Sequence, residues 1–155
     1  MLSASPRTRA QLADALRRKN IPDEVAERVL GRFSDVGLID DEVFAQAWVQ
    51  SRHTGRGLAK RALAAELRRR GVADETVNDA VEKLSPAQEE QTARALVVRK
   101  LPATASADPA KRMRRLVGML ARKGYPPGLS YRIVREALAE EGADLEALPD
   151  DPPTD

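Results

Sequence analysis

One pattern of apolar and polar positions occurs three times along the chain. In each copy an aliphatic stretch ends in basic residues, a turn residue follows, and a second aliphatic stretch begins. The copies are LADALRRKNIPDEVAERVL (12–30), LAAELRRRGVADETVNDAV (63–81) and LVGMLARKGYPPGLSYRIV (116–134). Asn20, Gly71 and Gly124 occupy the turn, and these residue types tolerate the positive φ that a helix C′ position usually demands. Self-similarity at this period is typical of a repeat protein, whose usual role is to present a binding surface.

The apolar positions within each copy follow the spacing of one helix face. Met113, Leu116, Val117 and Leu120 recur at i, i+3, i+4 and i+7. No stretch alternates with a period of two and no hairpin signal occurs, so the pattern predicts an all-α fold. We expect helices at about 7–19, 22–34, 40–54, 58–70, 74–84, 86–101, 109–123 and 127–141.

A further helix separates successive copies. Asp40-Asp41-Glu42 begins one, because acids favour the positive end of the helix dipole, and Ser85-Pro86 begins the other with an N-cap residue followed by proline. The unit therefore has three helices, and we expect tandem three-helix repeats that form an elongated curved array. The expected divisions are an incomplete first repeat that lacks its first helix (1–38), a second repeat (39–84), a third repeat (85–142) and an acidic, proline-rich, disordered tail (143–155).

The composition favours a helical protein of a reducing compartment. Hydrophobic residues make up 42% of the chain but aromatic residues only 3%, which favours close packing of Ala, Leu and Val between helices. The absence of cysteine excludes disulfides and thiolate metal sites. No apolar run approaches the roughly 20 residues that span a bilayer, and the N-terminus lacks the apolar segment of a signal peptide. We therefore expect a cytoplasmic protein that does not contact membranes.

The residues that could support catalysis are few. His53 is the only histidine and has no nearby partner for a catalytic triad. Asp40, Asp41 and Glu42 are consecutive on a predicted helix and point about 100° apart, so the helix dipole explains them without a metal. Gly55-Arg56-Gly57 is too short for a phosphate-binding glycine loop. We expect no enzymatic activity, no metal and no cofactor.

Two basic segments are the strongest functional signal. Between Arg52 and Arg70 seven cations stand against Glu66, and between Arg94 and Lys123 nine stand against Asp108. Cations in a last helical turn offset the dipole, but Arg56, Lys60, Arg112 and Arg115 are expected at helix N-terminal ends, where the dipole disfavours them. The binding candidates are Arg52, Arg56, Lys60, Arg61, Arg68, Arg69, Arg70, Lys111, Arg112, Arg114, Arg115, Arg122 and Lys123.

A polyanion is the natural ligand for such segments, because each phosphate neutralised by Lys or Arg releases counterions. Base stacking requires aromatic platforms, and Phe44 and Trp48, four residues apart on one helix face, are better explained as core anchors. Specific readout of base pairs is also unsupported. The second helix of each copy would be the recognition helix, and in the first two copies it begins with acids (DEVAERVLGRF and DETVNDAVEKL).

One long segment resembles a known family. Residues 37–72, GLIDDEVFAQAWVQSRHTGRGLAKRALAAELRRRGV, are similar to the RecX family of bacterial recombination regulators. That family shows a G-[YLI]-[IL]-[DN]-[DE]…F…R…G-[RYK]-G…I/L…EL…KG signature there. The resemblance continues through DPAKRMRRLVGMLARKGY and YRIVREAL, and so covers about residues 7–141. The chain departs from the family in lacking the usual first helix of the first repeat and in its acidic tail.

This resemblance implies a regulator of RecA. RecX proteins are built of tandem three-helix repeats, bind within the groove of the RecA–DNA filament, and inhibit the ATPase, coprotease and strand-exchange activities of RecA. The expected partners are RecA and the RecA–single-stranded DNA filament, with direct DNA contact by the basic residues of a monomer, and the expected effect is on recombination, DNA repair and the SOS response. Two alternatives stay open: a general nucleic-acid-binding helical protein without a dedicated protein partner, and a helical adaptor for another acidic protein.

Overall fold

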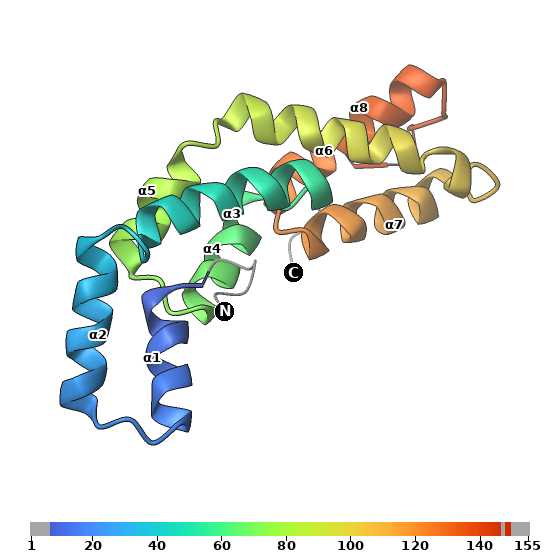
Figure 1. Cartoon of the computed structure of the whole chain (residues 1–155). Helices are drawn as coiled ribbons and strands as arrows, with labels where there is room; N and C mark the ends of the chain where they lie inside the picture. Colours follow the sequence, from blue (N-terminus) through green and yellow to red (C-terminus); the bar gives the residue numbers. More distant parts are fainter. Residues whose placement is uncertain (1–6, 147, 150–155) are drawn as a thin grey trace. The chain divides into compact units, whose positions relative to one another are not determined.

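The computed structural model describes residues 7–146, 148 and 149. These residues form eight α-helices and no strand, which confirms the predicted all-α class, and the helix ends agree with the predicted ones to within two residues (Figure 1). The helices are α1 (Arg9–Arg18), α2 (Asp23–Asp35), α3 (Asp41–Arg56), α4 (Lys60–Arg69), α5 (Asp74–Glu82), α6 (Pro86–Lys100), α7 (Pro109–Arg122) and α8 (Pro127–Glu141). A 3₁₀-helix, η1 (Pro102–Thr104), lies between α6 and α7. None of the described helices has the length and apolarity needed to cross a membrane.

Short-range side-chain contacts determine where several helices begin. The Ser85 side chain accepts a hydrogen bond from the backbone N–H of Gln88 (3.1 Å), which confirms the predicted cap of α6. The Asp108 side chain caps α7 in the same way, through the N–H of Lys111 (2.9 Å). Asp40 Oδ1 accepts from the N–H groups of Glu42 (3.1 Å) and Val43 (3.2 Å) at the start of α3. Asp40, one of the acids predicted at this helix start, therefore acts as its capping group.

The three turns that motivated the repeat have the same backbone geometry. Asn20, Gly71 and Gly124 have φ values of 62°, 83° and 95°. The following N–H donates five residues back in each case, to Leu16 O, Leu67 O and Leu120 O, always at 3.1 Å. This pair of features is the Schellman C-cap, so the positive φ predicted for these turns is confirmed.

The chain divides into two compact units. Unit 1 comprises Met1–Arg52 and Leu63–Lys83, and unit 2 comprises His53–Ala62 and Leu84–Asp155. The end of α3, the α3–α4 loop and the first turn of α4 thus pack with unit 2, whereas the rest of α3 and α4 packs with unit 1.

A similar contact recurs within each unit. In unit 1, Thr8 Oγ1 at the start of α1 donates to Arg70 O (2.7 Å), and a Cβ on Gly71 would lie 2.3 Å from the Cβ of Ala10. In unit 2, Ala59 N before α4 donates to Lys123 O (2.9 Å), and a Cβ on Gly124 would lie 2.8 Å from the Cβ of Ala62. The turn after one copy's first helix therefore packs against the start of the preceding copy, and this approach excludes any side chain at the turn.

The core of unit 2 lies among α6, α7 and α8. Its buried residues are Ala59, Ala93, Val97, Met113, Leu116, Leu120, Tyr125, Tyr131, Ile133, Val134, Ala137 and Leu138. Leu145 and Leu148 pack against this core, and Tyr131 Oη donates to the carbonyl of Pro149. As far as Pro149, the segment predicted to be a disordered tail makes these tertiary contacts; residues 147 and 150–155 lie outside the described residues.

The core of unit 1 is less complete in its first copy. Leu63 and Leu67 on α4 are fully buried, at 0% exposure. Their counterparts Leu12 and Leu16 on α1 are only half-buried, and α1, all of which is described, has no fully buried residue. Burial in this unit is therefore concentrated on α2, α3, α4 and α5, through residues such as Leu30, Val49 and Val77.

Candidate anion-binding surfaces

The thirteen basic candidates are distributed over both units. Four belong to unit 1: Arg52, Arg68, Arg69 and Arg70. Nine belong to unit 2: Arg56, Lys60, Arg61, Lys111, Arg112, Arg114, Arg115, Arg122 and Lys123. Some of them have partners within the protein, and others are exposed without an ion-pair partner in the described residues.

In unit 1, two of the arginines lie over the ring of Trp48. The guanidinium carbons of Arg52 and Arg70 are 4.2 Å and 3.9 Å from the ring centroid, a cation–π geometry. The indole Nε1 donates to Glu66 Oε1 (3.0 Å), and the Phe44 ring stacks at a centroid distance of 5.7 Å. Trp48 is thus engaged within the protein, as predicted for an anchor, although it and Phe44 are half-buried rather than buried. Its contacts also restrict the two arginine side chains.

The other basic residues at the end of α4 differ in their engagement. Arg68 Nε pairs with Asp74 Oδ1 at 3.1 Å, and both side chains are largely exposed. Arg70 Nη1 also donates to Glu66 O (3.2 Å), which satisfies a carbonyl in the last turn. Arg69 is exposed and has no ion-pair partner in the described part of the chain.

Unit 2 contains a cavity of about 670 Å³ that we call the basic hollow. Four cations line it, Arg56, Arg99, Lys100 and Lys123, and none of the described lining residues is acidic. The remaining lining residues are His53, Thr54, Gly55, Gly57, Gln91, Thr92, Ala95, Leu96 and Met119. The hollow thus brings together the end of α3, the α3–α4 loop, α6 and α7.

The sequence interpretation missed Arg99 and Lys100 as candidates. Both lie within the second basic segment and in the last turn of α6, where the helix dipole favours cations. The only available signal was therefore the charge count itself. Proximity to Arg56, more than forty residues earlier, is a tertiary property.

Side chains of unit 2 hold three consecutive carbonyls at the end of α3 and in the α3–α4 loop, and the first two belong to residues that line the hollow. Lys123 Nζ donates to Arg56 O, Tyr125 Oη to Gly57 O and His53 Nδ1 to Leu58 O, each at 2.8 Å. A carbonyl can only accept, so Nδ1 of His53 carries the proton. Burial raises the pKa of Tyr125 well above its usual value, so its hydroxyl remains a donor. The α3–α4 loop is therefore held in place by unit 2.

The backbone here corrects one prediction and explains the glycine at position 57. Arg56 is the last residue of α3 rather than a residue at a helix N-terminus, so the helix dipole favours its charge. Gly57 has φ of 68°, and a Cβ there would lie 2.8 Å from Leu96 Cδ1. His53, for which the sequence offered no partner, is buried between Leu58 O and Thr92 Oγ1, with its Nε2 2.8 Å from that hydroxyl.

Arg112 has a structural explanation that requires no ligand. Its exposure is 4%, and its guanidinium contacts both carboxylate oxygens of Glu141, at 2.5 and 3.0 Å. It also donates to Thr104 Oγ1 (3.1 Å) and Leu101 O (3.2 Å). The hydrogen bond with Glu141 raises the pKa of Arg112 and lowers that of Glu141. A ligand is therefore not needed to explain this cation near the start of α7. On the same helix, Lys111, Arg114, Arg115 and Arg122 are exposed.

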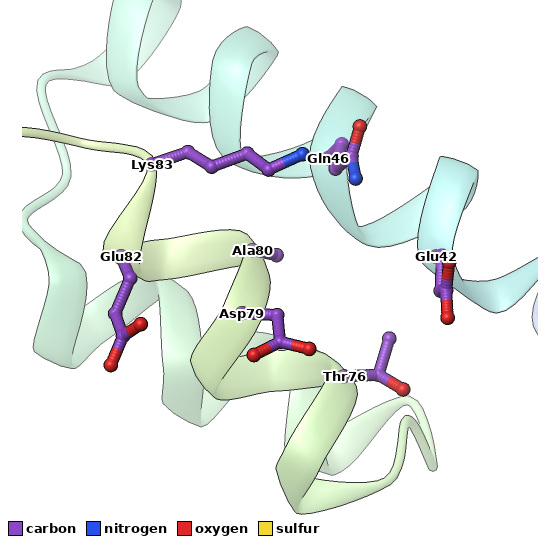
Figure 2. A pocket seen from close by; sticks show the side chains of 7 residues that line it. All are labelled: Glu42, Gln46, Thr76, Asp79, Ala80, Glu82 and Lys83. Carbon is purple, nitrogen blue, oxygen red and sulfur yellow. The ribbon is translucent and has the colours of Figure 1, made fainter.

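A second hollow, of about 430 Å³, lies in unit 1 and has the opposite charge. Glu42 and Gln46 line it from α3, and Thr76, Asp79, Ala80, Glu82 and Lys83 line it from α5 and the residue after it (Figure 2). Figure 2 shows the Lys83 side chain extending towards Gln46. The carboxylates disfavour a phosphate, and no group of three or more His, Asp or Glu residues in the described part of the chain could hold a metal ion.

Comparison with known proteins gives concordant matches along the chain. Three family models match in order: RecX, first three-helix domain (1–33), second three-helix domain (40–81) and third three-helix domain (88–134). The "Regulatory protein RecX" of Thermobifida fusca is 64% identical over 146 residues, which cover 94% of this chain and 79% of that protein. The protein of the same name from Streptomyces lividans is 61% identical over 151 residues, covering 97% and 80%.

Solved structures agree on the fold. The crystal structure of RecX from Lactobacillus salivarius superposes with a TM-score of 0.77 at 19% identity and covers 90% of this chain and 88% of that one. A crystal structure described as regulatory protein RecX gives 0.76 at 21% identity, covering 87% and 66%. At these identities the likeness concerns the helical fold, which is that of three-helix domains in tandem.

Proposed function

This chain belongs to the RecX family of regulatory proteins, and from that membership we propose that it regulates RecA. It binds RecA and the RecA–single-stranded DNA filament and inhibits the ATPase, coprotease and strand-exchange activities of RecA. In this way it modulates recombination, DNA repair and the SOS response. It acts as a cytoplasmic monomer, through binding rather than through chemistry of its own.

Exposed basic residues on both units support this proposal. A filament of protein on DNA presents phosphates and carboxylates, and cations that have no internal partner can contact either. Arg61, Arg69, Arg114, Arg115 and Arg122, like Lys111, are exposed and have no ion-pair partner in the described residues. We include Arg52, Arg56, Lys60, Arg68, Arg70, Lys111 and Lys123 in the proposed surface, and leave out Arg112 because its guanidinium is committed to Glu141.

Charge reversal at two exposed positions tests the proposal. Arg61→Glu combined with Arg69→Glu changes the charge by four units without breaking an ion pair in the described chain. Arg18→Glu with Lys19→Glu is the matched control, since these residues are also exposed, one in the last turn of α1 and one at its C-cap, and lie outside the proposed surface. We expect the first variant to lose inhibition of the DNA-dependent ATPase of RecA while helicity by circular dichroism is unchanged. Full inhibition by this variant would refute the assignment of these residues.

A second candidate function, general nucleic-acid binding without a protein partner, is favoured by the absence of acids among the described residues of the basic hollow. Binding to bare single-stranded DNA and to preformed RecA–DNA filament across a salt series separates the two. A RecA regulator prefers the filament at moderate salt, where phosphate contacts alone are weakened. Equal affinity for both would favour the second function.

A further inference from the structure

The cations of the basic hollow differ from the other basic residues because they line a concave site, and hydrogen bonds hold part of its wall in place. We propose that it is a phosphate-binding site that takes the sugar–phosphate backbone of a single DNA strand. This proposal rests on the proposed function, which supplies the DNA strand. It deepens that function by assigning the DNA contact to four residues: Arg56, Arg99, Lys100 and Lys123. Two of them were not among the sequence-predicted candidates.

The charge arrangement along α6 supports this site. Arg94, near the middle of the helix, is engaged by Glu136 (2.5 Å), with Glu140 and Glu90 also within 4.0 Å. Arg99 and Lys100, in the last turn, are exposed and have no ion-pair partner in the described part of the chain. The helix thus pairs its central arginine with carboxylates and directs its terminal cations into a hollow whose described lining contains none.

Lys123, which also lines the hollow, has donors available for a ligand. Lys123 Nζ has three N–H donors and gives one to Arg56 O, so two remain for a phosphate. That same bond, with those from Tyr125 and His53, fixes the loop that carries Arg56 at the edge of the hollow. Such preorganisation reduces the entropy lost on binding.

The lining favours a nucleic-acid backbone over a protein surface. Protein interfaces are anchored by aromatic residues and are depleted in lysine at their centre, whereas this hollow contains two lysines and, among its described lining residues, no phenyl or indole ring. Protein–DNA interfaces are much more positively charged. Ala95, Leu96 and Met119 offer an apolar surface for a deoxyribose. Without stacking platforms the site contacts phosphate and sugar and reads no base sequence.

The test measures binding of the full chain to a fluorescently labelled oligothymidylate by anisotropy between about 50 and 200 mM salt. Arg99→Gln with Lys100→Gln removes two cations from the hollow and keeps good helix formers. At about 0.7 units of log–log salt slope per phosphate contact, we expect the slope to shrink by about 1.4 and the affinity at about 0.1 M salt to fall roughly 25-fold. Arg18→Gln with Lys19→Gln, the same residue types at the end of α1, is the matched control and should bind as wild type does.

A second variant guards against an effect of folding. Gln91→Glu is nearly isosteric, lies at an exposed position of the hollow, and introduces one carboxylate there. We expect it to weaken binding roughly 5-fold at about 0.1 M salt, the effect of one lost contact. Wild-type affinity of both hollow variants would overturn the proposal, and so would an equal loss in the α1 control, which would indicate diffuse attraction.

Two further measurements identify the source of the phosphate and separate this site from the proposed function. Adenosine triphosphate is titrated against the wild-type chain with and without the oligonucleotide, and binding of the nucleotide without binding of the strand would overturn the assignment to DNA. Binding to RecA in the absence of DNA is measured for every variant. If the hollow variants bind RecA normally and lose only the strand, both proposals stand. If wild type binds the strand but never RecA, the proposed function fails and the site remains.

Discussion

Arg112 provides the sharpest separation between a structural and a ligand-binding arginine. In Arg112→Ala the side chain that links α7 to η1 and α8 is lost. Removing one partner of a buried ion pair costs about 3–5 kcal/mol when the other charge remains buried. Glu141 is 37% exposed in its side chain and can regain water, and Thr104 Oγ1 still donates to Leu101 O at 3.0 Å. We therefore expect a smaller loss of about 2–3 kcal/mol in the free energy of unfolding.

Thermal and urea unfolding followed by circular dichroism measure this loss. For a chain of this size the melting temperature should fall by roughly 4–12 °C. Arg114→Ala, at an exposed neighbouring position on α7, is the control and should change stability by no more than about 0.5 kcal/mol. Arg112→Met with Glu141→Gln should recover part of the loss, because an apolar replacement of a buried pair is often tolerated. An Arg112→Ala protein with wild-type stability and weakened binding to the RecA filament would refute the structural role.

Three further predictions follow from contacts within the units. Gly71→Ala should lower the free energy of unfolding by about 1–2 kcal/mol because of its positive φ, and by about 1–3 kcal/mol more because of the contact with Ala10. Asn20→Ala should show only the loss that comes from the positive φ, and equal losses in the two variants would contradict the contact with Ala10. The hydrogen bond from Arg94 lowers the pKa of Glu136 in the folded protein. The ionised Glu136 therefore stabilises the fold above about pH 4.5, and this stabilisation is lost as the pH falls through the lower pKa of the folded state. Glu136→Gln should make acid unfolding less steep, and an unchanged acid transition would count against this. Arg70→Ala should expose the single tryptophan, Trp48, to acrylamide quenching and cost about 0.5–1 kcal/mol, and unchanged quenching would show that the cation does not cover the ring.

The candidate site was predicted in part, and the reason is visible in particular residues. The sequence identified Arg56 and Lys123 by charge density, and both line the basic hollow. It could not separate them from Arg112, because the partner of Arg112, Glu141, lies 29 residues away on another helix. The family signature includes a glycine at position 57, but only the structure explains why glycine is needed there: φ is positive and Leu96 approaches closely. The boundaries expected for the three repeats, and the roles of the exposed cations, stay predictions.

Local interactions explain why the sequence alone determined the helices and their ends. Caps at Ser85 and Asp108 and the turns at Asn20, Gly71 and Gly124 depend on residues no more than five positions apart, so their pattern is readable without the fold. Tertiary structure alone decided which repeated positions became different. Asn20 is exposed, whereas Gly71 and Gly124 receive the start of a preceding helix so closely that no Cβ fits, and Leu12 and Leu16 stay half-buried where Leu63 and Leu67 are fully covered. Packing and charge pairing join residues that are distant in sequence, so equivalent positions of the three copies can have different environments.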